Sequence, residues 1–139
     1  MPKLYTASVK NTNGREGQVV SSDGILDAKT EKPVEMGGKG GATNPEQLFA
    51  AAYSACYGGA LIFVAAKQGI TLPEATSTDC NVSFNVGDTG GLFLSVDLVV
   101  NMPGMDEERA QKLAQTTHNV CPYSKAVKGN VEVSLVVKV

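Results

Sequence analysis

The sequence predicts an α+β fold in a single domain over residues 1–139. Two observations indicate this class: short alternating segments are followed by a helical segment, and the same succession then occurs a second time. The composition agrees, because 42% hydrophobic and 19% charged residues are typical of a chain that buries one core. The sequence has no internal repeat and no low-complexity stretch, so one domain accounts for it.

The N-terminal part is expected to form a small β-meander. Its strands are predicted over residues 4–10, 17–21 and 25–29, with Asn13-Gly14 and Asp23-Gly24 as turn signals. Residues 36–43, MGGKGGAT, hold too many glycines for a helix or strand, which predicts a flexible loop. A phosphate site is not expected there, because the loop lacks the Lys-Ser/Thr ending of a P-loop.

A long central helix is predicted from Thr43-Asn44-Pro45-Glu46, a strong helix start, to about Gln68. Apolar residues occur on all its sides, so we expect it to be buried on every face. Gly58-Gly59 in its middle indicates a bend or close packing, since each glycine costs about 1 kcal/mol relative to alanine. Residues 48–66 approach the length of a membrane span, but they are mostly alanine and glycine, which favours a core helix.

The second half repeats the order of strands and helix. Residues 78–86 and 92–101 alternate as two strands of a β-hairpin, and acidic residues at 106–108 open a helix to about Asn119. Cys121-Pro122 interrupts or restarts that helix. Residues 130–139 alternate as a final half-buried strand.

Charge and composition exclude several classes of function. Twelve Lys and Arg against fourteen Asp and Glu, spread along the chain, give a net charge of -2 and no basic patch for a nucleic acid or a membrane surface. The start of the chain, MPKLYTASVK, has no apolar run of the kind that directs export, so a cytoplasmic location is expected.

Sulfur is the reactive chemistry that remains. The cysteines are Cys56, Cys80 and Cys121, an odd count that argues against a structural disulfide framework. Their spacing is not that of a zinc site, and His118 is the sole histidine, so neither a closed metal site nor a Ser-His-Asp triad on a G-x-S-x-G turn is expected.

Four residues are candidates for one site: Cys56, Cys121, Arg15 and Glu46. Each has an ordinary structural alternative. The two cysteines would be buried unpaired thiols, Arg15 a surface charge beside a turn, and Glu46 a first-turn acid that interacts with the helix dipole. Glu46 and Cys56 lie ten positions apart, roughly 15 Å along one helix and about 80° around it, so they cannot touch directly. If both serve one site, either Arg15 bridges them or Glu46 comes from a second subunit, which favours a dimer.

Two long cysteine-bearing strings resemble a known family. These are TNPEQLFAA at 43–51 leading to YSAC at 53–56, and VCPYS at 120–124, supported by Gly14-Arg15 and the SSDG turn at 21–24. They are similar to the organic hydroperoxide resistance (Ohr) branch of the Ohr/OsmC family, and the likeness spans nearly the whole chain. The form Val-Cys-Pro-Tyr-Ser favours the Ohr branch over the OsmC branch.

The resemblance implies a thiol-dependent peroxidase that reduces organic hydroperoxides to alcohols. It assigns Cys56 as the peroxidatic cysteine, Cys121 as the resolving cysteine that forms a disulfide with it, and Arg15 with Glu46 as the charged pair that supports the thiolate. It also implies an OsmC-like fold as an intertwined homodimer, no bound cofactor, and a dithiol reductant such as the dihydrolipoyl group of a lipoylated protein. Cys80 has no role in the family and is expected to be a strand residue.

Other functions stay open at this point. The OsmC branch would share the chemistry with another substrate preference, whereas a non-catalytic carrier of an apolar ligand would contain the cysteines as ordinary core. A redox sensor would form the same disulfide, but the sequence has no DNA-binding helix or basic patch. Four aromatic residues could line an apolar site or belong to the core: Phe49, Tyr53, Phe84 and Phe93.

Overall fold

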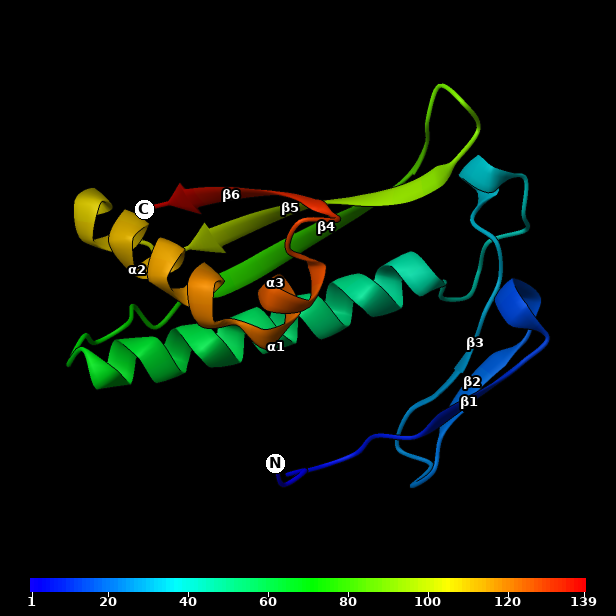
Figure 1. Cartoon of the computed structure of the whole chain (residues 1–139), viewed down its shortest axis with the longest axis horizontal. Helices are drawn as coiled ribbons and strands as arrows, with labels where there is room; N and C mark the ends of the chain where they lie inside the picture. Colours follow the sequence, from blue (N-terminus) through cyan, green and yellow to red (C-terminus); the bar gives the residue numbers. More distant parts are fainter. The chain divides into compact units, whose positions relative to one another are not determined.

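The computed structural model describes all residues from 1 to 139, which separate into two units, residues 1–48 and 49–139. The first unit is built on three antiparallel strands, β1 (Val9–Thr12), β2 (Gln18–Ser21) and β3 (Asp27–Lys29), in the order β1-β2-β3. The predicted meander is therefore confirmed. The second unit holds the other three strands and most of the helical residues (Figure 1). Whether residues 1–139 act as one domain stays a prediction.

The first strand is shorter than the alternation predicts. Strand β1 begins at Val9, which pairs with Ser21, the last residue of β2, while Leu4 and Tyr5 are exposed. The expected strand over residues 4–8 is wrong within this chain, because those residues extend past the end of their partner strand. A period-two pattern indicates which residues can form a strand, but a ladder also needs a neighbour.

Two short 3-10 helices lie in the loops of the first unit. The first, η1 (Gly14–Glu16), closes the β1–β2 turn, in which Asn13 and Gly14 adopt the left-handed region as the Asn-Gly signal predicts. The second, η2 (Val34–Met36), leads into the glycine-rich segment, which forms turns and no regular element beyond residue 36, so the predicted loop is confirmed.

Helix α1 (Pro45–Lys67) has the predicted start and end. The Asn44 side chain caps it by accepting a hydrogen bond from the Gln47 backbone N–H at 2.9 Å. Burial on every face is wrong within the single chain, since Ile62 and Phe63 are 64% and 59% exposed. The buried residues of α1 are Tyr53, Tyr57, Leu61, Val64 and Ala65.

The glycine pair and the apolar length of α1 have no explanation within the chain. A Cβ at Gly58 would meet only Thr78 Oγ1 at 4.0 Å, and one at Gly59 would meet nothing within 4 Å, so the close packing expected there is absent from one chain. The helix is also long and apolar enough to cross a membrane, with 28% of its most apolar window buried. Core helices of soluble proteins pass the same test, so this is weak evidence for a span.

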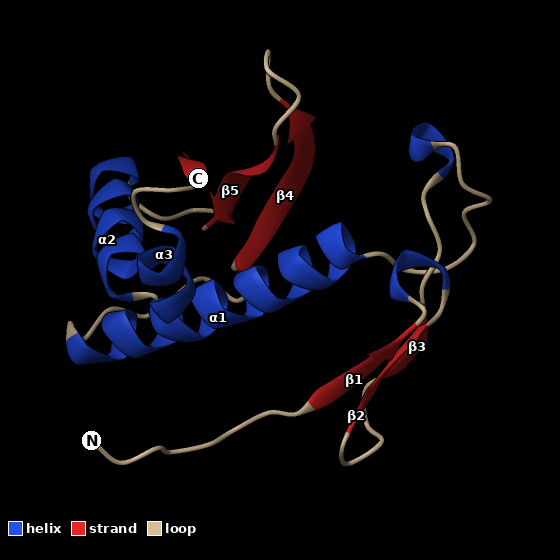
Figure 2. Cartoon of the chain, turned by 45° about the vertical axis from the view of Figure 1, so that its right-hand side comes forward, coloured by secondary structure: helices blue, strands red, loops and turns tan.

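The second unit is a three-stranded sheet with helices packed on it (Figures 1 and 2). Strands β4 (Ser77–Val86) and β5 (Leu92–Asn101) form the predicted antiparallel hairpin, and β6 (Glu132–Lys138) pairs parallel to β5. A parallel pairing needs a crossover connection, which α2 (Glu107–Val120) and α3 (Pro122–Val127) supply. The predicted restart of the helix at Cys121-Pro122 is thus confirmed.

The core lies between this sheet and the helices. Alternate residues of β5, namely Val96, Leu98 and Val100, are at most 2% exposed, and they pair with partly buried Val133, Leu135 and Val137 of β6. The core is completed by Met102, by α2 residues Ala110, Leu113 and Ala114, and by Tyr53, Tyr57 and Cys121. Cys121 therefore belongs to the packed interior of the unit.

Candidate active site

The loop that carries Arg15 is held by polar contacts of the first unit. The Asn11 side chain accepts from the Gly14 N–H at 3.0 Å and donates to the Gly14 carbonyl at 3.0 Å. Buried Thr30 donates to that same carbonyl at 3.0 Å and accepts from the Gly17 N–H at 2.9 Å. A Cβ at Gly17 would come within 1.8 Å of the Thr12 carbonyl oxygen, so this turn requires glycine.

Arg15 and Glu46 form a bidentate ion pair within the first unit. Arg15 Nη1 donates to Glu46 Oε2 at 2.9 Å, and Nη2 donates to Oε1 at 2.6 Å. The side chains are 27% and 13% exposed, so water screens the pair less than it screens a surface pair. These hydrogen bonds from Arg15 lower the pKa of the Glu46 carboxyl below its ordinary value, and the pair raises the pKa of Arg15. Both groups are therefore charged at neutral pH.

Cys56 and Cys121 form the second pair, within the second unit. Cys56 lies on α1, and Cys121 follows the last residue of α2 and occupies the N-cap position of α3. Their Sγ atoms are 3.9 Å apart and both thiols are free. They lie 65 positions apart in the sequence, so the packing of α3 against α1 brings them together. A disulfide needs about 2.05 Å, so a modest shift would join them.

The backbone of α3 also donates a hydrogen bond to the Cys56 sulfur. The Cys56 thiol is partly buried, and burial raises its pKa, while a hydrogen bond from the Tyr123 backbone N–H lowers it and nearby Cys121 raises it. Tyr123 is free to donate because the first N–H groups of a helix have no partner inside the helix, and Pro122 in the preceding position has none to offer. The arrangement thus directs one donor at the sulfur atom that would carry the negative charge.

The structure brings the predicted residues together as two pairs, Arg15 with Glu46 and Cys56 with Cys121, each within its own unit. Cys80 lies on β4 beside the core, where burial raises its pKa to about 11, as expected for an unreactive strand residue. The aromatic candidates divide: Tyr53 is fully buried, whereas Phe84 and Phe93 are 37% and 53% exposed.

The sequence did not predict the hydrogen bonds that link three further side chains on the helices that carry the cysteines. The Tyr53 hydroxyl lies 2.7 Å from Ser124 Oγ, which lies 2.8 Å from His118 Nδ1. Ser124 lies in the string Val-Cys-Pro-Tyr-Ser, but the local sequence does not show which side chain of another helix it contacts. The backbone donor at Tyr123 could have been expected from a cysteine that directly precedes a proline at a helix start.

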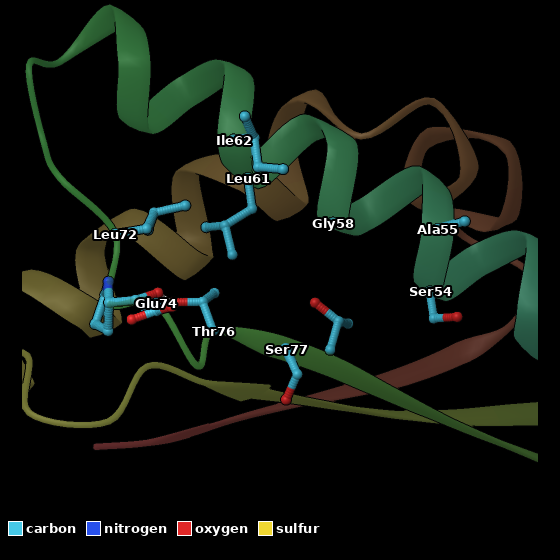
Figure 3. Close-up of a pocket in the computed structure, with 11 residues that line it drawn as sticks. Ser54, Ala55, Gly58, Leu61, Ile62, Leu72, Glu74, Thr76 and Ser77 are labelled. Atoms are coloured by element: carbon cyan, nitrogen blue, oxygen red, sulfur yellow. Dashed lines mark hydrogen bonds between the residues drawn. The ribbon is translucent and has the colours of Figure 1, made fainter.

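A cavity of about 430 Å³ opens beside α1, but neither cysteine lines it (Figure 3). Leu61 and Leu72 point into one end of it, and Glu74, Thr76 and Ser77 approach from the segment before β4 and its first residue. The cavity is therefore separate from the sulfur pair.

Comparisons with known proteins agree with this fold. The family model described as OsmC-like protein matches residues 38–136. The organic hydroperoxide resistance protein of Xanthomonas axonopodis pv. citri is 50% identical over 134 residues, which cover 95% of this chain and 93% of the relative. The crystal structure of an organic hydroperoxide resistance protein OsmC from Legionella pneumophila has a TM-score of 0.93 at 44% identity, covering 99% of this chain and 100% of that one.

A third relative matches by both sequence and structure. Organic hydroperoxide resistance protein OhrB of Bacillus subtilis is 45% identical over 136 residues, which cover 97% of this chain and 98% of the relative. Its crystal structure has a TM-score of 0.89 and covers 98% of this chain and 100% of that one. The chain therefore belongs to the Ohr/OsmC family. Within it, these relatives carry the name organic hydroperoxide resistance protein, which confirms the resemblance to the Ohr branch and the α+β fold class.

Proposed function

We propose that this chain is a cysteine-based peroxidase that reduces organic hydroperoxides to alcohols and so gives resistance to organic peroxides. The observation that carries the proposal is the pair of free thiols, Cys56 and Cys121, with their sulfur atoms 3.9 Å apart. The names of the relatives support the role in peroxide resistance.

The first step is attack of the Cys56 thiolate on the distal oxygen of the hydroperoxide. The O–O bond breaks, a sulfenic acid forms on Cys56, and the alkoxide takes up a proton and leaves as the alcohol. In the second step the Cys121 sulfur attacks the Cys56 sulfur, the S–O bond breaks, and the hydroxyl leaves as water with the thiol proton. Two electrons pass from the two thiols to the peroxide, and a Cys56–Cys121 disulfide is left.

Arg15 and Glu46 have supporting roles in this proposal. Burial raises the pKa of Cys56, so the thiolate needs a positive charge to favour it. A guanidinium stays protonated when it is desolvated, and the bidentate contact with Glu46 holds its fork in one orientation. We propose that this ion pair stabilises the Cys56 thiolate.

A preference for organic peroxides would follow if apolar side chains line the site of Cys56. An alkyl hydroperoxide gains about 0.8 kcal/mol per buried CH₂ group, a gain that hydrogen peroxide lacks. We propose alkyl hydroperoxides as the substrate class, in agreement with the name of the Ohr relatives. The alternative is the substrate preference of the OsmC branch. Comparing the turnover rates with an alkyl hydroperoxide and with hydrogen peroxide distinguishes the two.

The reductant and the assembly belong to the same proposal. The cycle needs no bound cofactor, because two electrons from an external dithiol reduce the disulfide, and a dihydrolipoyl group on a lipoylated protein is the dithiol we propose. We also propose a cytoplasmic homodimer, with neither nucleic acid nor membrane as a partner. The exposed apolar face of α1 at Ile62 and Phe63 supports the dimer.

The experiment that tests the proposal measures consumption of an alkyl hydroperoxide with a dithiol reductant. Wild type should turn over, Cys56→Ser should not, and Cys121→Ser should stop at an oxidised Cys56, visible by intact mass. Cys80→Ser is the matched control, because it removes the cysteine outside the pair and should leave turnover unchanged.

One result would contradict the proposal. If wild type consumes no alkyl hydroperoxide and never loses the mass of two hydrogens to form the Cys56–Cys121 disulfide, the chain is not a peroxidase. A carrier of an apolar ligand then becomes the function to pursue, and binding of that ligand should be insensitive to Cys56→Ser.

A further inference from the structure

A single buried hydroxyl links the three helices around the cysteines. Ser124 of α3 is 4% exposed, and its Oγ lies 2.7 Å from the Tyr53 hydroxyl of α1 and 2.8 Å from His118 Nδ1 of α2. In both views of the fold, α3 lies against α1 and beside α2 (Figures 1 and 2). Each helix therefore contributes one group to the same hydrogen-bond chain.

These hydrogen bonds lie next to the cysteine pair. Tyr53 precedes Cys56 by three residues on α1, and Ser124 follows Cys121 by three residues on α3. Three residues correspond to nearly one helical turn, about 4.5 Å along the axis. The contact between Tyr53 and Ser124 thus lies about one turn from the contact between the two sulfur atoms, so a shift of α3 against α1 would move both contacts.

The number of hydrogen atoms available determines which group donates in each of these two hydrogen bonds. Tyr53 is fully buried, and its hydroxyl has no hydrogen-bond partner in the structure other than Ser124, so its proton must go to Ser124 Oγ. The Ser124 proton then has His118 Nδ1 as its acceptor, which requires a neutral imidazole with its own proton on Nε2. In this arrangement all the donors between Tyr53 and His118 are satisfied.

A protonated His118 breaks this arrangement. Its Nδ1–H would donate to Ser124 Oγ, so the Ser124 proton would lose its acceptor. That proton then either has no acceptor or turns toward Tyr53 and leaves the buried Tyr53 proton without one. An unsatisfied buried donor is costly, so α3 is expected to move away from α1 until water or another group reaches the unsatisfied hydroxyl.

The surroundings of His118 disfavour the charged form. His118 lines a cavity of about 460 Å³, in which α3 contributes Lys125 and the following turn contributes Lys128. The other cavity residues from α2 are the uncharged Gln115 and Asn119, those near and on β6 are valines, and no carboxylate lines the cavity. Burial, together with the charge of Lys128, lowers the pKa of His118 below its ordinary value.

We propose that His118, acting through Ser124 and Tyr53, is a positioning residue for disulfide formation. The neutral imidazole holds α3 against α1 with Cys121 beside Cys56, and protonation of the imidazole releases this arrangement. The inference rests on the proposed function for its biological meaning, because it concerns the step in which Cys121 resolves an oxidised Cys56.

The test uses dithiobis-nitrobenzoate, an aromatic disulfide, and therefore does not depend on peroxidase activity. Cys56, the more exposed cysteine of the pair, attacks the reagent, and a mixed disulfide forms with loss of one nitrobenzenethiolate. Cys121 then attacks the Cys56 sulfur, and a second nitrobenzenethiolate leaves as the internal disulfide forms. The rate of the second release measures how well Cys121 is placed. All proteins carry Cys80→Ser, so that only the pair reacts.

Four variants separate an acceptor role from simple packing. His118→Leu and Ser124→Ala should slow the second release by about tenfold, as expected for the loss of one buried hydrogen bond. His118→Asn should stay within about twofold of the His118 parent, because the amide oxygen can accept near the position of Nδ1. Tyr53→Phe, which removes one oxygen atom from a buried ring, should also slow the second release and is the variant of choice if the others do not fold.

The pH dependence adds a readout that packing alone would not give. The ratio of the second-release rate in the His118 parent to the rate in the His118→Asn variant should be constant near neutral pH. It should fall at acid pH, with a midpoint below the ordinary histidine value of about 6.5. Dividing by the His118→Asn rate removes the titration of the thiols themselves.

Two results would overturn the inference. One is a second release at the parent rate in His118→Leu, Ser124→Ala and Tyr53→Phe. The other is a rate in His118→Asn as low as in His118→Leu together with a ratio that is flat with pH. Absence of alkyl hydroperoxide turnover in wild type, by contrast, would overturn the proposed function and leave the positioning result standing.

Discussion

At the residue scale, the fork geometry of Arg15 predicts that a lysine cannot replace it. Arg15→Lys keeps the charge but loses the two parallel hydrogen bonds to Glu46, so the cation is no longer held in one orientation. We expect the rate of Cys56 oxidation by an alkyl hydroperoxide to fall by about tenfold or more. The matched control is Arg109→Lys, the other arginine of the chain, which lies exposed on α2. Equal rates in both variants would contradict the role of Arg15.

The Glu46 carboxylate predicts how stability depends on pH. The hydrogen bonds from Arg15 lower the pKa of Glu46 in the folded chain. The ionised carboxylate therefore stabilises the fold at pH values above the unfolded pKa of about 4.3. This stabilisation is lost as the pH falls through the folded pKa. The gap in unfolding free energy between wild type and Glu46→Gln should therefore be constant near neutral pH and shrink below about pH 5.

Urea unfolding over this pH range measures that gap. Glu132→Gln is the control, because it removes an exposed carboxylate that forms no ion pair in the structure. A gap that widened on acidification would show that the sign assigned to Glu46 is wrong.

The same residues show how far the site could be predicted from sequence. The sequence predicts Cys56, Cys121, Arg15 and Glu46 because the strings around them resemble a family and because the composition excludes other chemistry. The Tyr123 donor and the link from Tyr53 to Ser124 depend on how α3 lies across α1, and no local pattern encodes that contact. Hydrogen bonds between helices far apart in the sequence are set by tertiary packing, which the local sequence does not specify.

At the element scale, helix α2 is capped by Asp106, whose side chain accepts a hydrogen bond from the Arg109 N–H at 3.0 Å. Asp106→Ala should lower the unfolding free energy by about 1 kcal/mol, the usual value of such a cap. Urea unfolding measures it, with Asp88→Ala in the exposed β4–β5 turn as the control. A loss no larger than the control's would mean that the cap contributes nothing.

Local signals explain which elements were predicted well. The start of α1 at Pro45 and the β4–β5 hairpin depend on residues within a few positions of each other, and both have the predicted bounds to within a residue or two. The start of β1 depends on where β2 ends, and the parallel pairing of β6 with β5 depends on the crossover between them. Those features are set by partners far along the chain, so alternation alone misplaced or missed them.

At the scale of the whole molecule, the exposed apolar face of α1 predicts association. Ile62→Lys places a charge on that face and should convert the proposed dimer, twice the 14.5 kDa of one chain, into monomers. Light scattering coupled to size exclusion measures the mass. Gln111→Lys adds the same charge to the exposed surface of α2 and should leave the mass unchanged. A wild-type mass of one chain would contradict the dimer.

The proximity of Cys56 and Cys121 also concerns the unfolded chain. A bond between residues 65 positions apart closes a large ring, and such a ring removes chain entropy from the unfolded state worth about 4 kcal/mol at room temperature. The oxidised protein should thus melt on the order of 10 °C above the reduced protein, a difference that calorimetry on the two forms would measure and that Cys121→Ser should abolish. During each proposed catalytic cycle the chain would gain and then lose this cross-link. The melting temperature would therefore differ between the oxidised and reduced forms and would report which of the two is present.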